Sequence, residues 1–91
     1  MNPLQIITQL KNYVDEQIIL KGKQEELRTT NIKPVKRQYQ FTTEYINSEY
    51  EDWYDLTIIV GKSFIEVGDK AEYITVDTIE QAKNEINNYL F

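Results

Sequence analysis

The chain has 91 residues, 41% of them hydrophobic, and a formal net charge of −5, with no cysteine and no histidine. This length suits one folded domain over residues 1–91, because two smaller cores would bury too little apolar surface to offset the conformational entropy lost on folding. The missing residue types exclude thiolate nucleophiles, imidazole bases and Cys/His zinc sites, so we expect no enzyme, no cofactor and no metal. No segment resembles a membrane span or a secretory leader, which favours a cytoplasmic protein without membrane contact.

The N-terminal segment predicts an amphipathic helix. Asn2 suits the N-cap, the proline after it suits the first helical position, and Gln5 can close a capping box. We expect the helix to end near Lys21, because Gly22 can adopt a left-handed cap, although a helix that continues past Gly22 is left open. Apolar residues at spacings of three and four form the face expected to be buried: Leu4, Ile7, Leu10, Val14 and Ile18.

The middle of the chain predicts a meander of antiparallel strands. Residues 29–34 contain structure breakers and are expected to form a loop. From 35 to 45 the apolar period changes to two, which is typical of a long, half-exposed strand, and the alternation returns over 54–60. Short glycine turns then separate two further strands, over 63–67 and 71–76.

The C-terminal segment predicts a second helix, capped by Asp77 or Thr78. Its apolar stripe consists of Ile79, Ala82, Ile86 and either Tyr89 or Leu90. The fold class is therefore α+β. We expect an antiparallel three- to four-stranded sheet flanked by an N-terminal and a C-terminal helix, as a two-layer sandwich with one sheet face covered by the helices.

Charge is distributed unevenly along the chain. Residues 1–37 hold seven basic and four acidic residues, net +3, whereas residues 38–91 hold three basic and eleven acidic residues, net −8. Residues 38–61 contain five carboxylates and no lysine or arginine. Tyrosines and a tryptophan lie between these carboxylates, and large aromatic side chains are frequent anchors of protein interfaces.

This acidic segment is the candidate partner-binding site. A row of carboxylates can imitate a phosphate backbone and occupy a basic groove through electrostatic complementarity. We interpret the chain as a small acidic inhibitor, of the anti-CRISPR or anti-restriction style and encoded by a phage or mobile element. It would block the nucleic-acid-binding surface of a larger, basic protein without binding nucleic acid directly. The residues expected to contact the partner are Glu44, Glu49, Tyr50, Glu51, Asp52, Trp53 and Asp55.

Other interpretations of the charged residues stay open at this point. The acidic segment can serve only to solvate a turn. It offers oxygen donors for calcium, but it lacks the ligand spacing and central glycine of a calcium loop. A carboxylate pair for glycoside hydrolysis is the best enzymatic alternative, and the sequence does not define the distance between the two groups.

A basic run in the first half offers a surface of opposite charge. Glu25 and Glu26 lie within this run and disfavour nucleic-acid binding. Its members are Lys21, Lys23, Arg28, Lys33, Lys36 and Arg37. The main alternative function is a homo-oligomeric structural or accessory subunit, such as a homodimer, in which the basic third of one copy meets the acidic remainder of another.

Overall fold

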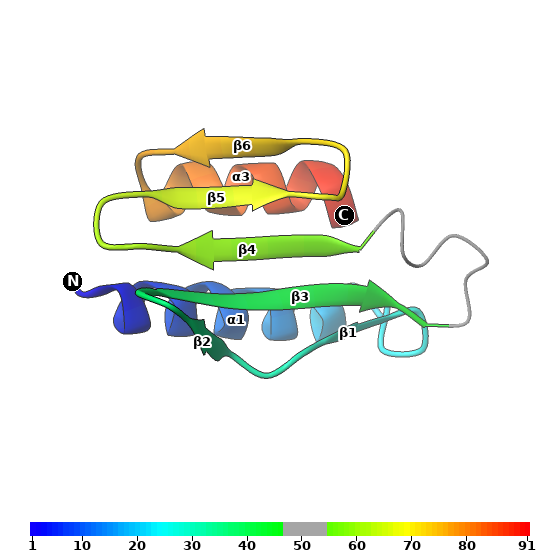
Figure 1. Ribbon diagram of the computed structural model, residues 1–91. Helices are drawn as coiled ribbons and strands as arrows, with labels where there is room; N and C mark the ends of the chain where they lie inside the picture. The colour runs from blue at the N-terminus through cyan, green and yellow to red at the C-terminus, as the bar shows by residue number, and fades with distance from the viewer. Residues whose placement is uncertain (47–54) are drawn as a thin grey trace.

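A computed structural model describes residues 1–46 and 55–91. In this part of the chain two α-helices and a six-stranded antiparallel sheet form an α+β fold. The elements in chain order are α1 (Pro3–Leu20), β1 (Leu27–Thr29), β2 (Lys33–Val35), β3 (Gln38–Tyr45), β4 (Leu56–Val60), β5 (Ile65–Gly68), β6 (Tyr73–Val76) and α3 (Ile79–Leu90) (Figure 1). Within the described residues, neither helix has the length and hydropathy needed to cross a bilayer.

Helix α1 begins and ends where the sequence predicts. The Asn2 side chain accepts a hydrogen bond from the Gln5 backbone at 2.8 Å, and the Asn2 backbone donates to Gln5 Oε1 at 3.0 Å, which completes the capping box. At the other end Gly22 has a φ of 66°, and the Lys23 backbone donates to the Ile18 carbonyl at 2.8 Å, as in a Schellman motif. The helix therefore stops before the connection to β1.

The sheet has six strands, so the expectation of three or four is wrong. The additional strands are β1 and β2, which pair with successive parts of the same edge of β3. β1 lies mostly before the loop predicted over 29–34, where no element was expected, and β2 overlaps the end of that loop. Each has three residues, too few to show an apolar period. Proline is tolerated in β2 because an edge strand needs only half of its backbone donors.

The predicted long strand over 35–45 is also divided. Val35 pairs with Gln38 across a tight turn in which Lys36 has a φ of 59°. Val35 thus ends β2, and its side chain is 38% exposed rather than part of the core. The alternation predicted for the remainder is confirmed, because Phe41 and Thr43 are buried on the inward face of β3.

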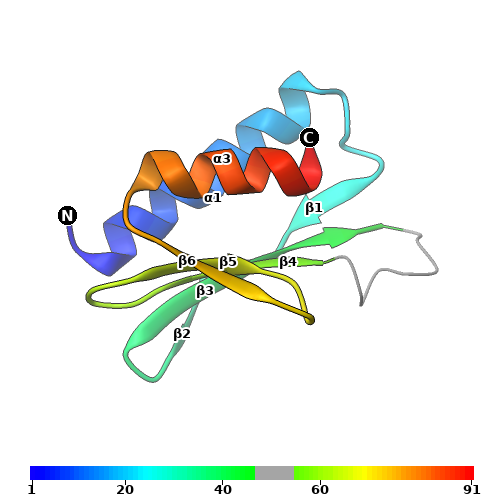
Figure 2. The same ribbon diagram turned by 90° about the horizontal axis from the view of Figure 1, so that it is seen from above.

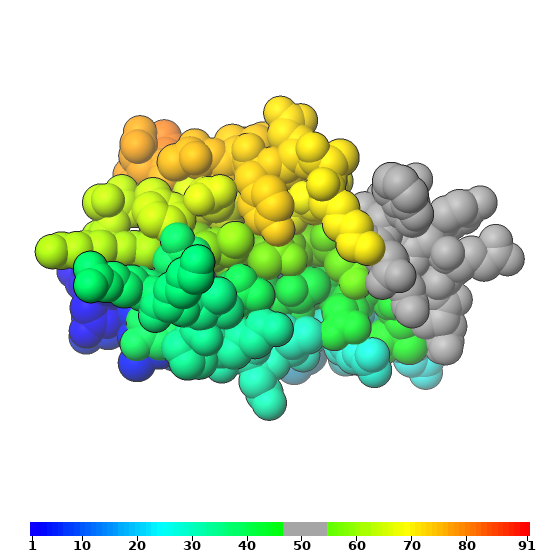
Figure 3. Space-filling view, in the orientation of Figure 1, coloured from blue at the N-terminus to red at the C-terminus, as the bar shows by residue number. Residues whose placement is uncertain are grey.

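Both helices cover the same face of the sheet and run in the same direction (Figure 2). Strand order is β1-β3-β4-β5-β6, with β2 beside β1 on the edge of β3. Side chains of α1 and α3 meet the inward side chains of the strands in one core, which includes Ile7, Val14, Phe41, Ile58 and Ile86. The opposite sheet face carries neither of the two described helices and is the face seen in Figure 3.

Helix α3 is capped by Thr78, which settles the alternative between Asp77 and Thr78. The Thr78 hydroxyl accepts from the Gln81 backbone at 3.1 Å, while the Asp77 backbone donates to Gln81 Oε1 at 2.7 Å. Leu90, rather than Tyr89, is the buried residue that ends the apolar stripe. The two helices are joined by the Tyr13 hydroxyl and Asn87 Oδ1, 2.7 Å apart.

Candidate functional site

The antiparallel topology brings charged residues from distant parts of the sequence to two opposite ends of the sheet. At one end β3 and β5 finish, β4 and β6 begin, and both helices terminate (Figure 1). The β2–β3 turn, the β4–β5 turn and the first turns of α1 and α3 all lie toward the other end (Figure 1). We call these the acidic end and the basic end, for the charges described next.

The acidic end collects carboxylates from three separate connections. They lie in the α1–β1 connection, at the facing ends of β3 and β4, and in the β5–β6 turn, and they outnumber the basic residues there by six to four. The carboxylates are Glu25, Glu26, Glu44, Asp55, Asp69 and Glu72, and the basic residues are Lys21, Lys23, Arg28 and Lys70.

The helix termini reinforce this polarity. The C-termini of α1 and α3 both point to the acidic end (Figure 2), and neither helix has a basic residue in its last turn. Unpaired carbonyl groups give a helix C-terminus a partial negative charge. Backbone and side chains thus contribute the same sign at this end.

Two tyrosines respond to the negative charge at the acidic end. Burial raises the pKa of Tyr45 above its ordinary value, and the Asp55 and Glu26 carboxylates raise it further. Burial likewise raises the pKa of Tyr89, with added contributions from Asp69, Glu72 and Glu85. Since carboxylates disfavour a second negative charge, both hydroxyls keep their protons to a higher pH.

Of the predicted site residues, the structure describes Glu44 and Asp55 and places them at the acidic end. Thr43 and Leu56 form the last residue pair between β3 and β4. Glu44 follows Thr43 and Asp55 precedes Leu56, so both residues lie at the end of the β3–β4 ladder. Glu44 has a partner that sequence proximity does not reveal: β1 carries Arg28 opposite it, with Arg28 Nη2 and Glu44 Oε2 3.4 Å apart. The negative charge of Glu44 is therefore partly compensated.

Asp55 has a structural role at the start of β4. Its Oδ1 atom accepts a hydrogen bond from the Tyr45 backbone at 3.1 Å, and the residue makes a further interaction as well. A carboxylate that binds backbone in this way orders the end of the β3–β4 pair. Asp55, one residue of the acidic segment, therefore stabilises the local backbone, as aspartates in turns commonly do.

The other predicted site residues lie outside the described part of the chain. They are Glu49, Tyr50, Glu51, Asp52 and Trp53. In the sequence they fall between Ile46 and Asp55, and both of these residues belong to the acidic end. Their role as partner contacts stays a prediction.

Sequence reasoning missed the carboxylates of the β5–β6 region. Glu66, Asp69, Glu72 and Asp77 lie within twelve residues that hold one basic residue, Lys70. No lysine or arginine of the described residues forms an ion pair with these four carboxylates. The local excess of carboxylates over basic residues is the signal that identifies this segment. The prediction was placed on residues 38–61 instead, because that longer segment contains no lysine or arginine.

The predicted basic run is not one surface. Lys21 and Lys23 follow α1 at the acidic end, where Lys23 pairs with Glu26 at 3.4 Å. Lys36 and Arg37 occupy the β2–β3 turn at the basic end, where Lys62 of the β4–β5 turn also lies. The fold thus divides between two ends a set of residues that the sequence presents as continuous.

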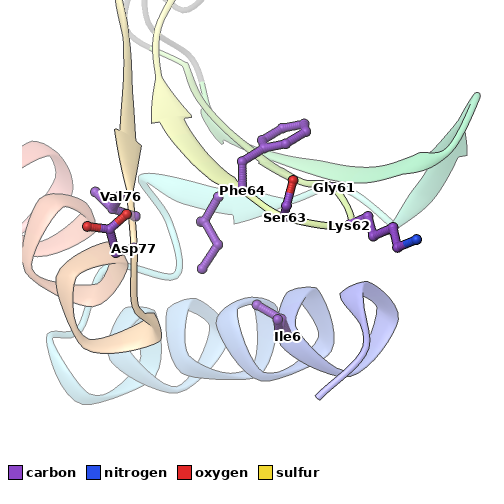
Figure 4. Close-up of a pocket in the computed structure, with 8 residues that line it drawn as sticks. Ile6, Gly61, Lys62, Ser63, Phe64, Val76 and Asp77 are labelled. Atoms are coloured by element: carbon purple, nitrogen blue, oxygen red, sulfur yellow. The ribbon is translucent and has the colours of Figure 1, made fainter.

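A cavity of about 250 Å³ lies at the basic end, between the β4–β5 turn, the first turns of α1 and the β6–α3 junction. Its polar groups come from Lys62, Ser63 and Asp77. In Figure 4 the Lys62 side chain extends away from Asp77, and the Phe64 ring points away from the helices. Among the described residues one carboxylate, that of Asp77, lines this cavity, whereas glycoside hydrolysis requires two.

The described residues contain no group of three carboxylates close enough together to hold a metal ion. Comparisons with protein-family models, with curated proteins and with solved structures gave no significant match. Residue geometry and charge are therefore the basis on which a function can be argued.

Proposed function

We propose that the chain is a small acidic protein that binds a basic surface of a larger protein. The partner's surface would be one that otherwise holds nucleic acid, and the chain would act as an inhibitor by occupying it. A phage or mobile element is the kind of source in which such a protein would be useful. The observation that carries the proposal is the acidic end, where carboxylates from three connections and two helix C-termini are gathered.

Two further features support recognition through this end. The acidic end already has a negative charge excess in its described residues, and the sequence between Ile46 and Asp55 adds three carboxylates and no basic residue. Negative charges presented together raise the encounter rate with a basic surface and strengthen its binding. Tyr50 and Trp53 belong to the same segment and would anchor the contact by burying large aromatic area.

Affinity capture from a nuclease-treated extract of the native host tests the proposal. The immobilised chain should retain a basic protein at about 0.1 M salt and release it at about 1 M salt, because the screening length falls from about 10 Å to about 3 Å. The variant Glu49→Gln/Glu51→Gln should lose this retention. A matched control, Glu16→Gln/Glu80→Gln, changes the net charge equally at two helix positions outside the segment between Ile46 and Asp55, and it should retain the partner.

Retention of the same protein by Glu49→Gln/Glu51→Gln, or equal loss with both double variants, would contradict recognition through the acidic end. The first result would mean that these carboxylates are not contacts, and the second that only net charge matters.

The opposite charges of the two ends favour one alternative, a homo-oligomer. The basic end of one copy, with Lys36, Arg37 and Lys62, would contact the acidic end of the next. Light scattering over a range of concentrations separates the two functions. An assembly that dissociates at high salt supports the oligomer, and a monomer at all concentrations contradicts it.

A further inference from the structure

Strand β6 forms one edge of the sheet in the described part of the chain. It is the last strand in the sheet order and pairs with β5 alone among the described strands. In the β5–β6 turn the Asp69 backbone donates to the Glu72 carbonyl at 3.1 Å. Hydrogen-bonded pairs alternate along an antiparallel ladder, so Ile74 and Val76 bond to β5, while the N–H and C=O groups of Tyr73 and Thr75 point to the open edge.

The position of this edge is well defined by packing. The Tyr73 ring lies against Gly68, its partner across the ladder, where a Cβ atom would meet it at 2.9 Å. An aromatic side chain that covers a cross-strand glycine stabilises the strand pair. Helix α3 packs on the face of the sheet, and β6 runs along the margin of the molecule (Figures 2 and 3).

Within the described residues, the two edges of the sheet differ in the features that prevent pairing with another chain. β1 and β2 are three-residue strands, and between them they carry Arg28, Lys33 and Pro34. Short strands, basic side chains and proline are the features by which proteins prevent an edge from pairing with another chain. β6 has four residues and contains neither a basic residue nor a proline, and Tyr73 is 43% exposed.

The charges around β6 select the kind of strand that can be added. Residues 66–77, which include β6, carry Glu66, Asp69, Glu72 and Asp77 and one basic residue, Lys70. A second copy paired along β6 would bring the same four carboxylates to the shared edge. Because like charges repel, this excess of negative charge disfavours pairing with a second copy and favours pairing with a basic segment.

We propose that the β6 edge binds an extended, lysine- or arginine-bearing segment of the partner protein as an additional strand. Backbone hydrogen bonds to Tyr73 and Thr75 would hold the segment, and its basic side chains would meet the surrounding carboxylates. The inference rests on the proposed function for the identity of the partner as a basic protein. It adds a second contact, along the strand that follows Asp69 and Glu72 of the acidic end, and a defined mode of recognition.

Peptide selection followed by hydrogen exchange tests the inference. A display library of random twelve-residue peptides is selected on the folded chain, and the strongest binder is synthesised. We expect lysine and arginine to flank β-branched residues in it. In the free chain the amides of Tyr73 and Thr75 should exchange rapidly, and the bound peptide should slow both by at least about ten-fold.

Two variants distinguish strand addition from simple charge attraction. Thr75→Pro removes the outward N–H group and leaves the bonds to β5 in place, so it should abolish peptide binding. Thr75→Val keeps that N–H group and should bind like the parent chain. Urea unfolding of both variants checks that each is folded. A further variant, Glu72→Gln/Asp77→Asn, should weaken peptide binding without changing which amides the peptide protects.

Failure to recover any peptide, or recovery of a peptide that leaves the Tyr73 and Thr75 amides unprotected, would overturn the inference. Peptide binding that survives Thr75→Pro would overturn it equally. These results are distinct from failure of the proposed function. If host-protein capture depends on Glu49 and Glu51 while Thr75→Pro has no effect on it, the acidic end binds the partner and the β6 edge does not.

Discussion

Arg28 lies opposite Glu44 in the β1–β3 ladder, with 3.4 Å between Arg28 Nη2 and Glu44 Oε2. The Arg28 side chain is 64% exposed, and a solvent-exposed ion pair of this kind contributes about 0.5 kcal/mol or less to stability. We expect Arg28→Gln, Glu44→Gln and the double variant to give a coupling energy of that size in urea unfolding. A coupling energy above about 1.5 kcal/mol would show that the pair is a major stabilising contact.

Thr43 offers a test of the core. Its hydroxyl is fully buried and has no hydrogen-bond partner among the described residues. Thr43→Val replaces that hydroxyl with a methyl group of similar size and should raise the free energy of unfolding by about 1 kcal/mol, because an unsatisfied buried polar group is removed.

Thr42→Val is the matched control for this change. The Thr42 hydroxyl lies 3.0 Å from that of Thr57 on the open face, so its removal should leave stability unchanged or lower it by up to about 1 kcal/mol. Urea unfolding measures both variants. Destabilisation by Thr43→Val would mean that the hydroxyl has a partner, such as an internal water molecule.

Gly68 and Gly22 should respond differently to alanine. A Cβ atom at Gly68 would collide with the Glu72 carbonyl and lie 2.6 Å from Tyr73 Cα, and these backbone atoms can move only if the β5–β6 turn opens. At Gly22 the φ of 66° is the main penalty, since no atom lies within 4 Å of the added carbon.

Gly22→Ala should therefore cost about 1 kcal/mol, and Gly68→Ala about 2 kcal/mol or more. Thermal or urea unfolding ranks the two variants. Equal losses would show that the turn accommodates a side chain, and that β6 is less firmly positioned than the structure indicates.

Because of the tyrosines at the acidic end, the free energy of unfolding should fall as the pH rises in the alkaline range. Between the unfolded-chain pKa of about 10 and the higher folded-state pKa, only the unfolded chain has lost the tyrosine proton. The stability contributed by the protonated Tyr45 and Tyr89 hydroxyls is present below pH 10 and is lost as the pH rises through their folded-state pKa values.

Absorbance titration of tyrosinate measures these pKa values directly. Asp69→Asn/Glu72→Gln should lower the pKa of Tyr89, because two of the carboxylates that raise it are neutralised, and should leave the titration of Tyr45 unchanged. The variant Tyr89→Phe identifies which part of the titration curve belongs to Tyr89. An unchanged Tyr89 pKa in the double variant would contradict the charge distribution described for the acidic end.

Local signals explain why parts of the fold could be predicted. The capping box at Asn2, the glycine after Lys21 and the alternation of Leu56, Ile58 and Val60 each depend on residues close in sequence. The same holds for α3, in which Thr78 and a spaced apolar stripe define the helix. β1 and β2 could not be found this way, because three residues show no period and their pairing depends on β3.

The sequence predicts the part of the candidate site in which the carboxylates lie close together along the chain. A run of carboxylates between Glu44 and Asp55 is visible in the sequence, and the structure places both of those residues at the acidic end. The compensation of Glu44 by Arg28 depends on strand pairing across sixteen residues. The edge position of β6 likewise depends on strand order, which no local pattern encodes.

Competition between the chain and nucleic acid tests the central claim most directly. The protein captured from the host is mixed with its fluorescently labelled nucleic acid, and anisotropy is followed as the chain is added at low salt. We expect full displacement of the nucleic acid by the parent chain and by Glu16→Gln/Glu80→Gln, and none by Glu49→Gln/Glu51→Gln. Formation of a ternary complex in which the nucleic acid stays bound would show that the acidic end does not occupy the nucleic-acid-binding surface.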